Sequence, residues 1–367
     1  MARRAPEEVM PARPPGERPR RPLKALGLLS GGLDSTLAAR LLQEQGVEVE
    51  GVHFSTGFCK VEHRRALGRE RDRVEPKRIR NEALRAGSDL RAPVEIVDVA
   101  EEYLRDVVLR PKHGYGSAMN PCIDCRIFML RKARDMARER GAEIVFTGEV
   151  LGQRPMSQHR AALALIEKES GLAGRLLRPL SARSLEPTEV EHRGRIDRER
   201  LGRITGRSRS EQLVLASRLG IGEFPAPSGG CCFLADRNFA RRLRDLVAQR
   251  GREGVRSADI LLLKIGRHFR LGPGLKVIVG RDEAESRLLE SRRGDLATCR
   301  VADGRGALGL VDGPLLGEDE GLVASLLARY STHRAAASVD VVLCRGGERV
   351  RLQAVPAADA WARERLI

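Results

Sequence analysis

The chain has 367 residues, and its 66 lysine and arginine side chains against 50 acidic ones give a net charge of +16 at pH 7. That length predicts two or three domains with ample core. The charge favours a polyanionic partner, although a solvated basic surface would have the same composition. No apolar run is long enough for a membrane-spanning helix, and the N-terminus lacks the apolar segment of a secretory signal, so we expect a cytoplasmic protein without a membrane partner.

The distribution of residue types predicts four segments. Residues 1–22 are rich in proline and arginine and offer little to bury, which is typical of a disordered basic tail. Residues 23–185 alternate apolar runs with helical patterns, which predicts an α/β domain with a parallel sheet. An arginine-rich connecting region follows at 186–254 and carries a second pair of cysteines. Short strands and turns at 255–367 predict a smaller α+β domain.

In chain order, the first predicted elements form a β-loop-α-β unit. Residues 23–29 are expected to be a strand, 30–35 a turn, 36–45 a helix that Gly46 ends, and 47–54 a second strand. The crossover between the two strands requires a parallel sheet. The later predicted elements are a solvent-facing helix within 60–91, strands at 94–99, 143–147, 261–265 and 276–279, and helices at 125–140 and 210–219.

The turn between the first strand and the first helix has the sequence Ser30-Gly31-Gly32-Leu33-Asp34-Ser35. Glycines let a backbone approach a ligand closely, and the unpaired amides at a helix N-terminus attract an anion. A simple turn would explain two glycines, but less easily the hydroxyls and the carboxylate at fixed offsets. The sequence is not a Walker A loop, because no Gly-Lys-Ser/Thr follows.

This motif resembles the PP-loop, Ser-Gly-Gly-x-Asp-Ser, of the ATP pyrophosphatase families. The resemblance implies a Rossmann-like adenine nucleotide alpha hydrolase fold and cleavage of ATP between its α- and β-phosphates. It further implies that the amides of Gly31 and Gly32, with the Ser30 and Ser35 hydroxyls, bind the pyrophosphate. Asp34 is then expected to act through Mg²⁺, a hard ion that prefers oxygen ligands.

The seven cysteines are unevenly placed, and an odd number without a secretory signal favours reduced thiols or metal ligands. Cys122 and Cys125 form a C-x-x-C pair ahead of a predicted helix, and Cys231 and Cys232 follow much later. A zinc site, a redox disulfide across the first pair and a 4Fe–4S cluster held by three cysteines with one open iron are all compatible with this spacing. The remaining cysteines are expected to be buried thiols: Cys59, Cys299 and Cys344.

The cysteine spacing resembles that of the PP-loop tRNA thiolases. Their 2-thiocytidine synthetases have a C-x-x-C pair and a distant third cysteine, and their 2-thiouridylases have Asn-Pro-Asp-x-x-Cys where this chain has Asn120-Pro121-Cys122-Ile123-Asp124-Cys125. The stretch from Gly148 to Gln158 resembles Gly-Glu-Ser-x-Gly-Gln-x-x-Ser-Gln of the tRNA 4-thiouridine synthetases. Arg178-Pro179-Leu180 matches the Arg-Pro-Leu that follows in that family. The resemblances cover about residues 24–235.

These resemblances imply an enzyme that thiolates a uridine or cytidine base of tRNA through an adenylated intermediate, converting ATP to AMP and pyrophosphate. The expected catalytic residues are Asp34, Cys122, Cys125 and Cys231. The last three would hold a 4Fe–4S cluster, with Cys232 as the alternate to Cys231. In a metal-free alternative, the same cysteines form a persulfide and a resolving disulfide.

The glycine-rich stretch after the fourth predicted strand is expected to complete the nucleotide site. Gly148 and Gln153 are the expected ATP-binding residues within it. Glu149, Gln153, Ser157 and Gln158 either line the nucleotide or base pocket or form the cap and first turn of a helix. No role is expected for the adjacent His159.

The implied partners are tRNA and a sulfur donor, either the persulfide of a cysteine desulfurase or free sulfide. Neither the THUMP domain that usually precedes 4-thiouridine synthetases nor a rhodanese-like domain is evident. Residues 266–271 and 276–281 instead resemble the NFACT-type RNA-binding domain. The alternative interpretation is a pair of strands whose arginine and histidine side chains only edge a small sheet.

Two other functions remain possible from the sequence. A PP-loop amidating or nitrile-forming ligase acting on a small molecule would leave the basic C-terminal domain unexplained. A non-catalytic RNA-binding factor would have had no reason to keep an intact Ser-Gly-Gly-x-Asp-Ser loop.

Overall fold

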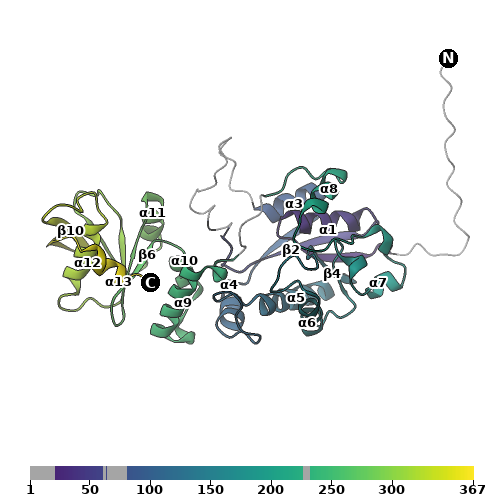
Figure 1. The fold of residues 1–367 in the computed structure, drawn as a ribbon, viewed down its shortest axis with the longest axis horizontal. Helices are drawn as coiled ribbons and strands as arrows, with labels where there is room; N and C mark the ends of the chain where they lie inside the picture. Colours follow the sequence, from purple (N-terminus) through teal and green to yellow (C-terminus); the bar gives the residue numbers. More distant parts are fainter. Residues whose placement is uncertain (1–20, 61–62, 64–80, 226–231) are drawn as a thin grey trace, which may run out of the picture.

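The computed structural model describes four stretches of the chain: residues 21–60, 63, 81–225 and 232–367. Figure 1 shows an N-terminal lobe built on one sheet, a C-terminal lobe built on a second sheet, and helices between them. Three predictions fall wholly or partly outside the described residues: the tail at 1–22, much of the basic segment at 60–91, and Cys231.

The N-terminal sheet has five parallel strands in the order β3-β2-β1-β4-β5. Its central strands are buried on both faces, as expected where helices cover both sides of a parallel sheet. The predicted α/β class and parallel sheet are therefore confirmed. The strands are β1 Lys24–Leu28, β2 Glu48–Ser55, β3 Val94–Asp98, β4 Ile144–Thr147 and β5 Leu176–Leu177.

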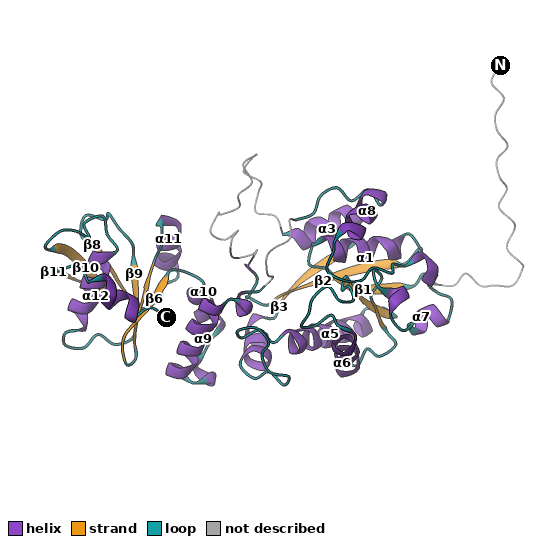
Figure 2. Cartoon of the chain, viewed as in Figure 1, coloured by secondary structure: helices purple, strands orange, loops and turns teal. Residues whose placement is uncertain are grey.

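Helices cover both faces of this sheet, and each face has its own apolar core (Figure 2). One face carries α1 Leu33–Gln43, α3 Glu82–Leu90 and α8 Ser210–Arg218, which contact one another. The predicted helix within 60–91 is thus only partly solvent-facing, because α3 buries Ala83, Ala86 and Leu90. The other face carries α4 Ala100–Tyr103, its π-helical continuation Leu104–Val108, α5 Cys122–Glu139 and α6 Arg160–Ser170; the short α7 spans Glu189–His192.

Two further helices join the N-terminal core to the second lobe. These are α9 Arg237–Arg250 and α10 Ser257–Leu263. Phe239 and Leu243 of α9 are buried in the same apolar cluster as Tyr103 of α4. The strand predicted at 261–265 is wrong, because most of it lies in α10, where Ile260 and Leu263 are buried one helical turn apart.

The C-terminal sheet has six antiparallel strands in the order β11-β10-β8-β9-β7-β6. It packs against α12 Asp319–Arg329, which confirms a smaller α+β domain. Leu366 forms an isolated antiparallel β-bridge with Phe269, so this segment covers the outer edge of β6. The other elements are β6 Arg267–Gly272, β7 Leu275–Val279, α11 Glu283–Ser291, β8 Ala297–Val301, β9 Gly309–Asp312, β10 Val339–Arg345, β11 Glu348–Ala354 and α13 Asp359–Glu364.

Among the residues that the structure describes, no helix is both long enough and apolar enough to cross a membrane.

The packing of Gly27 on β1 generates a stability prediction. A Cβ at this position would overlap the ring of Phe146, which is fully buried and has no space to move. We expect Gly27→Ala to lower the free energy of unfolding by about 1–3 kcal/mol through overpacking. Gly321→Ala is the matched control, because its Cβ meets nothing within 4 Å on helix α12. That change should raise stability by up to about 1 kcal/mol. Chemical denaturation measures the free energy of unfolding of both variants. Equal changes in the two variants would contradict the packing argument.

Candidate functional site

The PP-loop sequence lies at the carboxyl end of β1 and runs directly into α1. The helix begins at Leu33, three residues earlier than predicted, so Asp34 and Ser35 belong to its first turn. The Ser35 and Thr36 hydroxyls both donate to the Gly32 carbonyl at 3.0 Å, and the Gly32 N–H lies 3.4 Å from the Ser30 hydroxyl oxygen. Gly32 caps the helix without any side-chain acceptor for the first amides. This leaves a helix N-terminus suited to binding an anion.

Glycine is required at two positions around this loop. Gly31 has a positive φ of 74°, and a Cβ there would overlap the backbone of Glu82 at the start of α3. A Cβ at Gly148 would overlap the backbone of Asp34 and Ser35. The loop is therefore enclosed by the first turn of α3 on one side and by the segment after β4 on the other. Gly148 supports the nucleotide loop by packing against it.

Asp34 faces the segment that follows β4. Its Oδ2 accepts a hydrogen bond of 3.1 Å from Nε2 of Gln153, so the two expected nucleotide-site residues are in contact. Its Oδ1 is buried, and no described group donates to it. A buried carboxylate oxygen without a donor is costly unless a cation or ligand binds it. The site therefore fits Mg²⁺, which prefers carboxylate and phosphate oxygens.

Glu149 does not line an open pocket and instead lies in a buried ion-pair network. One oxygen is 3.2 Å from Nε of Arg178, and the other is 3.3 Å from Nε of Arg126. Burial raises the pKa of the Glu149 carboxyl, but the two guanidinium groups outweigh it and hold the pKa below its ordinary value. Arg178, from the predicted Arg-Pro-Leu motif, also pairs with Glu167 at 2.9 Å. Glu149 therefore links Arg126 and Arg178 inside the fold and does not line the pocket.

The remaining residues of the motif fold back on themselves ahead of α6. Ser157 and Gln158 are buried, and the Gln158 carbonyl accepts a hydrogen bond of 2.7 Å from the Gly152 amide. The cap of α6 is His159, whose ring nitrogen accepts from the Ala162 amide at 3.2 Å. The interpretation of these residues as the cap and first turn of a helix is therefore wrong, because α6 begins at Arg160 and His159 caps it.

The C-x-x-C pair opens α5. Cys122 is the first residue of the helix and Cys125 lies one turn later, so both side chains leave the same helix face. Asp124 between them accepts from the His113 amide at 2.9 Å and from its ring at 2.8 Å, which holds the loop before the helix. The His113 ring also lies 3.1 Å from Glu169 of α6. The start of α5 is therefore fixed independently of any metal.

Cys232 and Cys125 both pack against the apolar core that contains Tyr103. Burial raises the pKa of Tyr103 well above its ordinary value, and the neighbouring thiols of Cys125, Cys232 and Cys122 raise it further. The Tyr103 hydroxyl also shares a hydrogen bond with the Cys125 thiol. Cys232 is the member of the second cysteine pair that the structure describes. It is the alternate third ligand expected from the sequence. Cys231, the preferred third ligand, lies outside the described residues.

An aromatic cluster lies in the core against which Cys125 and Cys232 pack. It is concentrated here even though aromatic residues make up 3% of the chain. Ring-centroid distances of 5.4–6.0 Å link neighbouring members. An apolar shell of this kind limits solvent access and lowers the local dielectric constant around a metal or reactive sulfur. Its members are Phe58, Tyr103, Phe128, Phe233 and Phe239.

The thiols are not arranged for a single metal ion. Within the described residues, no three His, Cys, Asp or Glu side chains converge on one ion position. A zinc site needs such convergence, because four ligands bind one ion tetrahedrally. In a 4Fe–4S cluster each thiolate binds a different iron, so the sulfur atoms stand further apart. The described cysteines near the C-x-x-C motif supply thiols, which is the ligand type that holds a 4Fe–4S cluster.

Of the three cysteines expected to be buried thiols, only Cys299 is buried, and the expectation is wrong for Cys59 and Cys344. Cys299 is fully buried in β8, and burial raises the pKa of its thiol to about 12, as expected of an inert core residue. Cys344 is half-buried on β10 of the same lobe. Cys59 instead follows β2 and forms an isolated antiparallel bridge with Cys232. The sequence signal that was missed is its place just after a strand, at the edge of the sheet that carries the PP-loop.

The basic residues of the NFACT-like motif are largely internal. His268 is fully buried, and burial followed by the charge of Arg242 holds its pKa well below the ordinary value. Lys276 is buried 3.8 Å from Asp312, and Arg270 pairs with Asp245 at 2.6 Å. The strand that carries Arg267, His268 and Arg270 is the edge strand of the sheet, and Arg281 is exposed, so the alternative interpretation of a basic strand pair that edges a small sheet agrees with the structure. Surface arginines occur elsewhere on this lobe: Arg292, Arg293, Arg305, Arg334 and Arg349.

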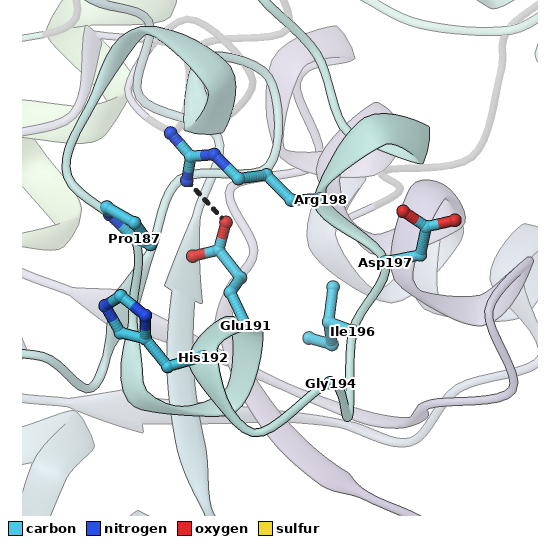
Figure 3. Close-up of a pocket in the computed structure, with 7 residues that line it drawn as sticks. All are labelled: Pro187, Glu191, His192, Gly194, Ile196, Asp197 and Arg198. Atoms are coloured by element: carbon cyan, nitrogen blue, oxygen red, sulfur yellow. Dashed lines mark hydrogen bonds and ion pairs between the residues drawn. The ribbon is translucent and has the colours of Figure 1, made fainter.

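A surface cavity of about 460 Å³ lies away from these residues, in the segment around α7. Figure 3 shows Glu191 and Arg198 facing each other across it, and their ion pair measures 2.6 Å. None of the PP-loop residues or cysteines lines this cavity, so it has no part in the candidate site.

The buried pair of Glu149 and Arg178 generates a second stability prediction. We expect Arg178→Met to cost about 3 kcal/mol at pH 7, because a buried carboxylate loses a partner. Since the folded pKa of Glu149 is lowered, its ionised form stabilises the protein above the unfolded pKa, and this contribution is lost as the pH falls through the folded value. The gap between wild type and variant should shrink below about pH 4. Arg193→Met, which breaks an exposed pair with Glu189, is the control and should change stability by less than about 1 kcal/mol.

Comparison with known families supports both halves of this description. Residues 23–167 match the family described as "tRNA methyl transferase HUP domain", and residues 266–364 match "NFACT protein RNA binding domain". A tRNA-specific 2-thiouridylase MnmA from Syntrophotalea carbinolica is 38% identical over 123 residues, which cover 33% of this chain and 32% of that protein. The chain thus spans about a third of that relative. The MnmA of Methylorubrum populi is 28% identical over 345 residues, covering 86% and 84% of the two chains.

Among solved structures, the U34-tRNA thiolase NcsA from Methanococcus maripaludis with its [4Fe-4S] cluster is 17% identical, with a TM-score of 0.30. The match covers 66% of this chain and 73% of that one. The expected resemblance to PP-loop tRNA thiolases and to the NFACT domain is confirmed by the sequence matches. The chain thus joins a HUP domain similar to that of tRNA 2-thiouridylases to a domain similar to the NFACT RNA-binding domain.

Proposed function

We propose that this protein thiolates a uridine or cytidine base of tRNA at the expense of ATP. The observation that carries the proposal is the combination of two features at one edge of the N-terminal sheet. One is a PP-loop with an unpartnered Asp34 oxygen, and the other is a group of three thiols around Tyr103. An adenylating ligase without sulfur chemistry would need only the first. The matches to 2-thiouridylases support the same reaction.

In the proposed reaction, the loop amides and the Ser30 and Ser35 hydroxyls hold the β- and γ-phosphates of ATP. Asp34 binds the Mg²⁺ that neutralises them, and Gln153 orients the Asp34 carboxylate through its hydrogen bond. The carbonyl oxygen of the base then attacks the α-phosphorus and releases pyrophosphate. Sulfur then attacks the activated carbon of the base, and the former carbonyl oxygen leaves as part of AMP. Activation is needed because a carbonyl oxygen is a poor leaving group, and positioning of the three reactants supplies much of the rate.

We assign the sulfur site to Cys122, Cys125 and a third thiol. Cys232 is supported as the third by its interaction with Tyr103, and Cys231 remains the alternative from the sequence. A 4Fe–4S cluster on these thiols would offer one iron without a protein ligand, at which hydrosulfide can bind. The metal-free alternative uses the same residues as a persulfide and a resolving disulfide.

We further propose that the C-terminal lobe helps to hold tRNA. Its match to the NFACT RNA-binding domain and the net charge of +16 support this role. The division of the chain into a PP-loop domain at 23–185, a connecting region at 186–254 and an RNA-binding domain at 255–367 is part of the same proposal. The base must leave any duplex stack to reach the loop. The sulfur donor would be a cysteine desulfurase persulfide or sulfide, in the cytoplasm where thiols stay reduced.

The proposed activity predicts that Asp34→Ala abolishes tRNA-dependent formation of AMP and pyrophosphate while the protein stays folded. The exposed Asp135→Ala, on the solvent side of α5, is the matched control and should keep full activity. A strain lacking the gene should lose one thionucleoside from its tRNA, and only the control variant should restore it. Mass spectrometry of tRNA hydrolysates measures this and identifies the base. An unchanged thionucleoside profile in the deletion strain would show that the proposed reaction is wrong.

The cluster assignment predicts about four irons per chain after anaerobic purification or reconstitution. Cys232→Ser should lower the iron content several-fold if Cys232 is the third ligand, whereas Cys231→Ser should lower it instead if the alternative holds. Cys344→Ser, a thiol of the C-terminal lobe, should leave the iron content unchanged. A colourless protein with stoichiometric zinc would exclude the cluster.

A further inference from the structure

Cys59 and Cys232 are joined by a short antiparallel pairing of backbone. Cys59 follows the end of β2, and Cys232 lies in the segment before α9, more than 170 positions later in the sequence. The two residues form an isolated bridge. The Phe233 amide donates to the Phe58 carbonyl at 3.0 Å. Neither cysteine belongs to a regular strand, so the two residues pair without being part of a sheet.

The hydrogen-bond pattern fixes the geometry of the pair. The bond joins the residues that flank the cysteines, which makes Cys59 and Cys232 a non-hydrogen-bonded antiparallel pair. In such pairs the Cα atoms are about 4.5 Å apart and both side chains leave the same face. Disulfides span Cα separations of about 4.4–6.8 Å. The two thiols can therefore be linked without moving the backbone far.

The position of the pair matters because Cys232 also belongs to the thiol group around Tyr103. Both cysteines are half-buried, so neither is sealed in the apolar core. The ammonium groups of Lys60 and Lys264 lie 5.7 and 5.6 Å from the ring centre of Phe233, next to Cys232.

We propose that Cys59 and Cys232 form a reversible disulfide that removes Cys232 from the group with Cys122 and Cys125. In the forward step, the Cys59 thiolate attacks a low-molecular-weight disulfide and releases one thiol, leaving a mixed disulfide. The Cys232 thiolate then attacks the Cys59 sulfur and releases the second thiol. The two cysteines lose two electrons and two protons, which the two released thiols take up. An excess of a dithiol reverses both steps.

The consequence for the sulfur site rests on the proposed function, but the disulfide itself does not. With Cys232 bonded to Cys59, only Cys122 and Cys125 remain available of the three thiols. The oxidised chain would then fail to assemble the site until it is reduced. Cys59 would thus control access to Cys232 without being one of the residues that bind the metal or the base.

The first test maps the disulfide directly. The full-length chain, purified anaerobically and freed of iron with a chelator, is treated with oxidised glutathione and digested without reduction. Mass spectrometry should find the peptide that contains Cys59 linked to the one that contains Cys232, and the link should persist in Cys231→Ser. It should disappear after dithiothreitol treatment. A link from Cys232 to Cys122 or Cys125, or glutathione adducts alone, would overturn the proposal.

The second test measures the consequence. After the same oxidation, wild type and Cys344→Ser should take up several-fold less iron on reconstitution than their reduced forms. Cys59→Ser should keep its uptake, with Cys59→Ala as a second variant in case serine perturbs the fold. Equal losses in wild type and both Cys59 variants would show that Cys59 does not control the site. If even the reduced wild type binds no iron, the cluster assignment fails, while the mapped disulfide still stands or falls by the first test.

Discussion

The site depends above all on the parallel register of the central strands. Leu28 of β1 lies opposite Val52 of β2 and Thr147 of β4, so β1 and β4 end at the same level of the sheet, and β2 continues in the same direction to Ser55. The PP-loop, the segment that begins at Gly148 and the segment that carries Cys59 therefore leave the sheet side by side. Carboxyl ends of parallel strands are where ligands bind in open α/β sheets. This register thus brings the proposed nucleotide chemistry and the proposed sulfur chemistry to the same end of the sheet.

The buried carboxylate of Glu149 connects these two chemistries. It sits directly after Gly148, which packs on the PP-loop, and it pairs with Arg126, the residue that follows Cys125. Arg178 completes the network from the end of β5. Separating the PP-loop from the C-x-x-C helix would leave the buried Glu149 carboxylate without a partner. The free-energy cost of such a buried, unpaired charge opposes this movement. The network holds the distance between the two halves of the site, which positioning catalysis requires.

Much of this arrangement could be predicted from local sequence, and the rest could not for identifiable reasons. The strand-loop-helix around Asp34 and the α5 helix after Cys125 have strong local patterns, and both were confirmed. The strand predicted at 261–265 failed because a short apolar run does not distinguish a buried helix from a strand. The roles of Glu149 and His268 depend on burial and on partners distant in sequence. No local pattern contains that information.

The pairing of Cys59 with Cys232 shows how tertiary contacts select among chemically equal residues. Cys232 has extended backbone, with φ of −136° and ψ of 139°. Successive side chains on extended backbone leave opposite faces, so two adjacent cysteines cannot both serve one site without a local distortion. The bridge fixes which face Cys232 presents, and Cys59 lies on the same face. The sequence offers two thiols at this point, and the backbone of a segment far away in the chain determines how one of them is used.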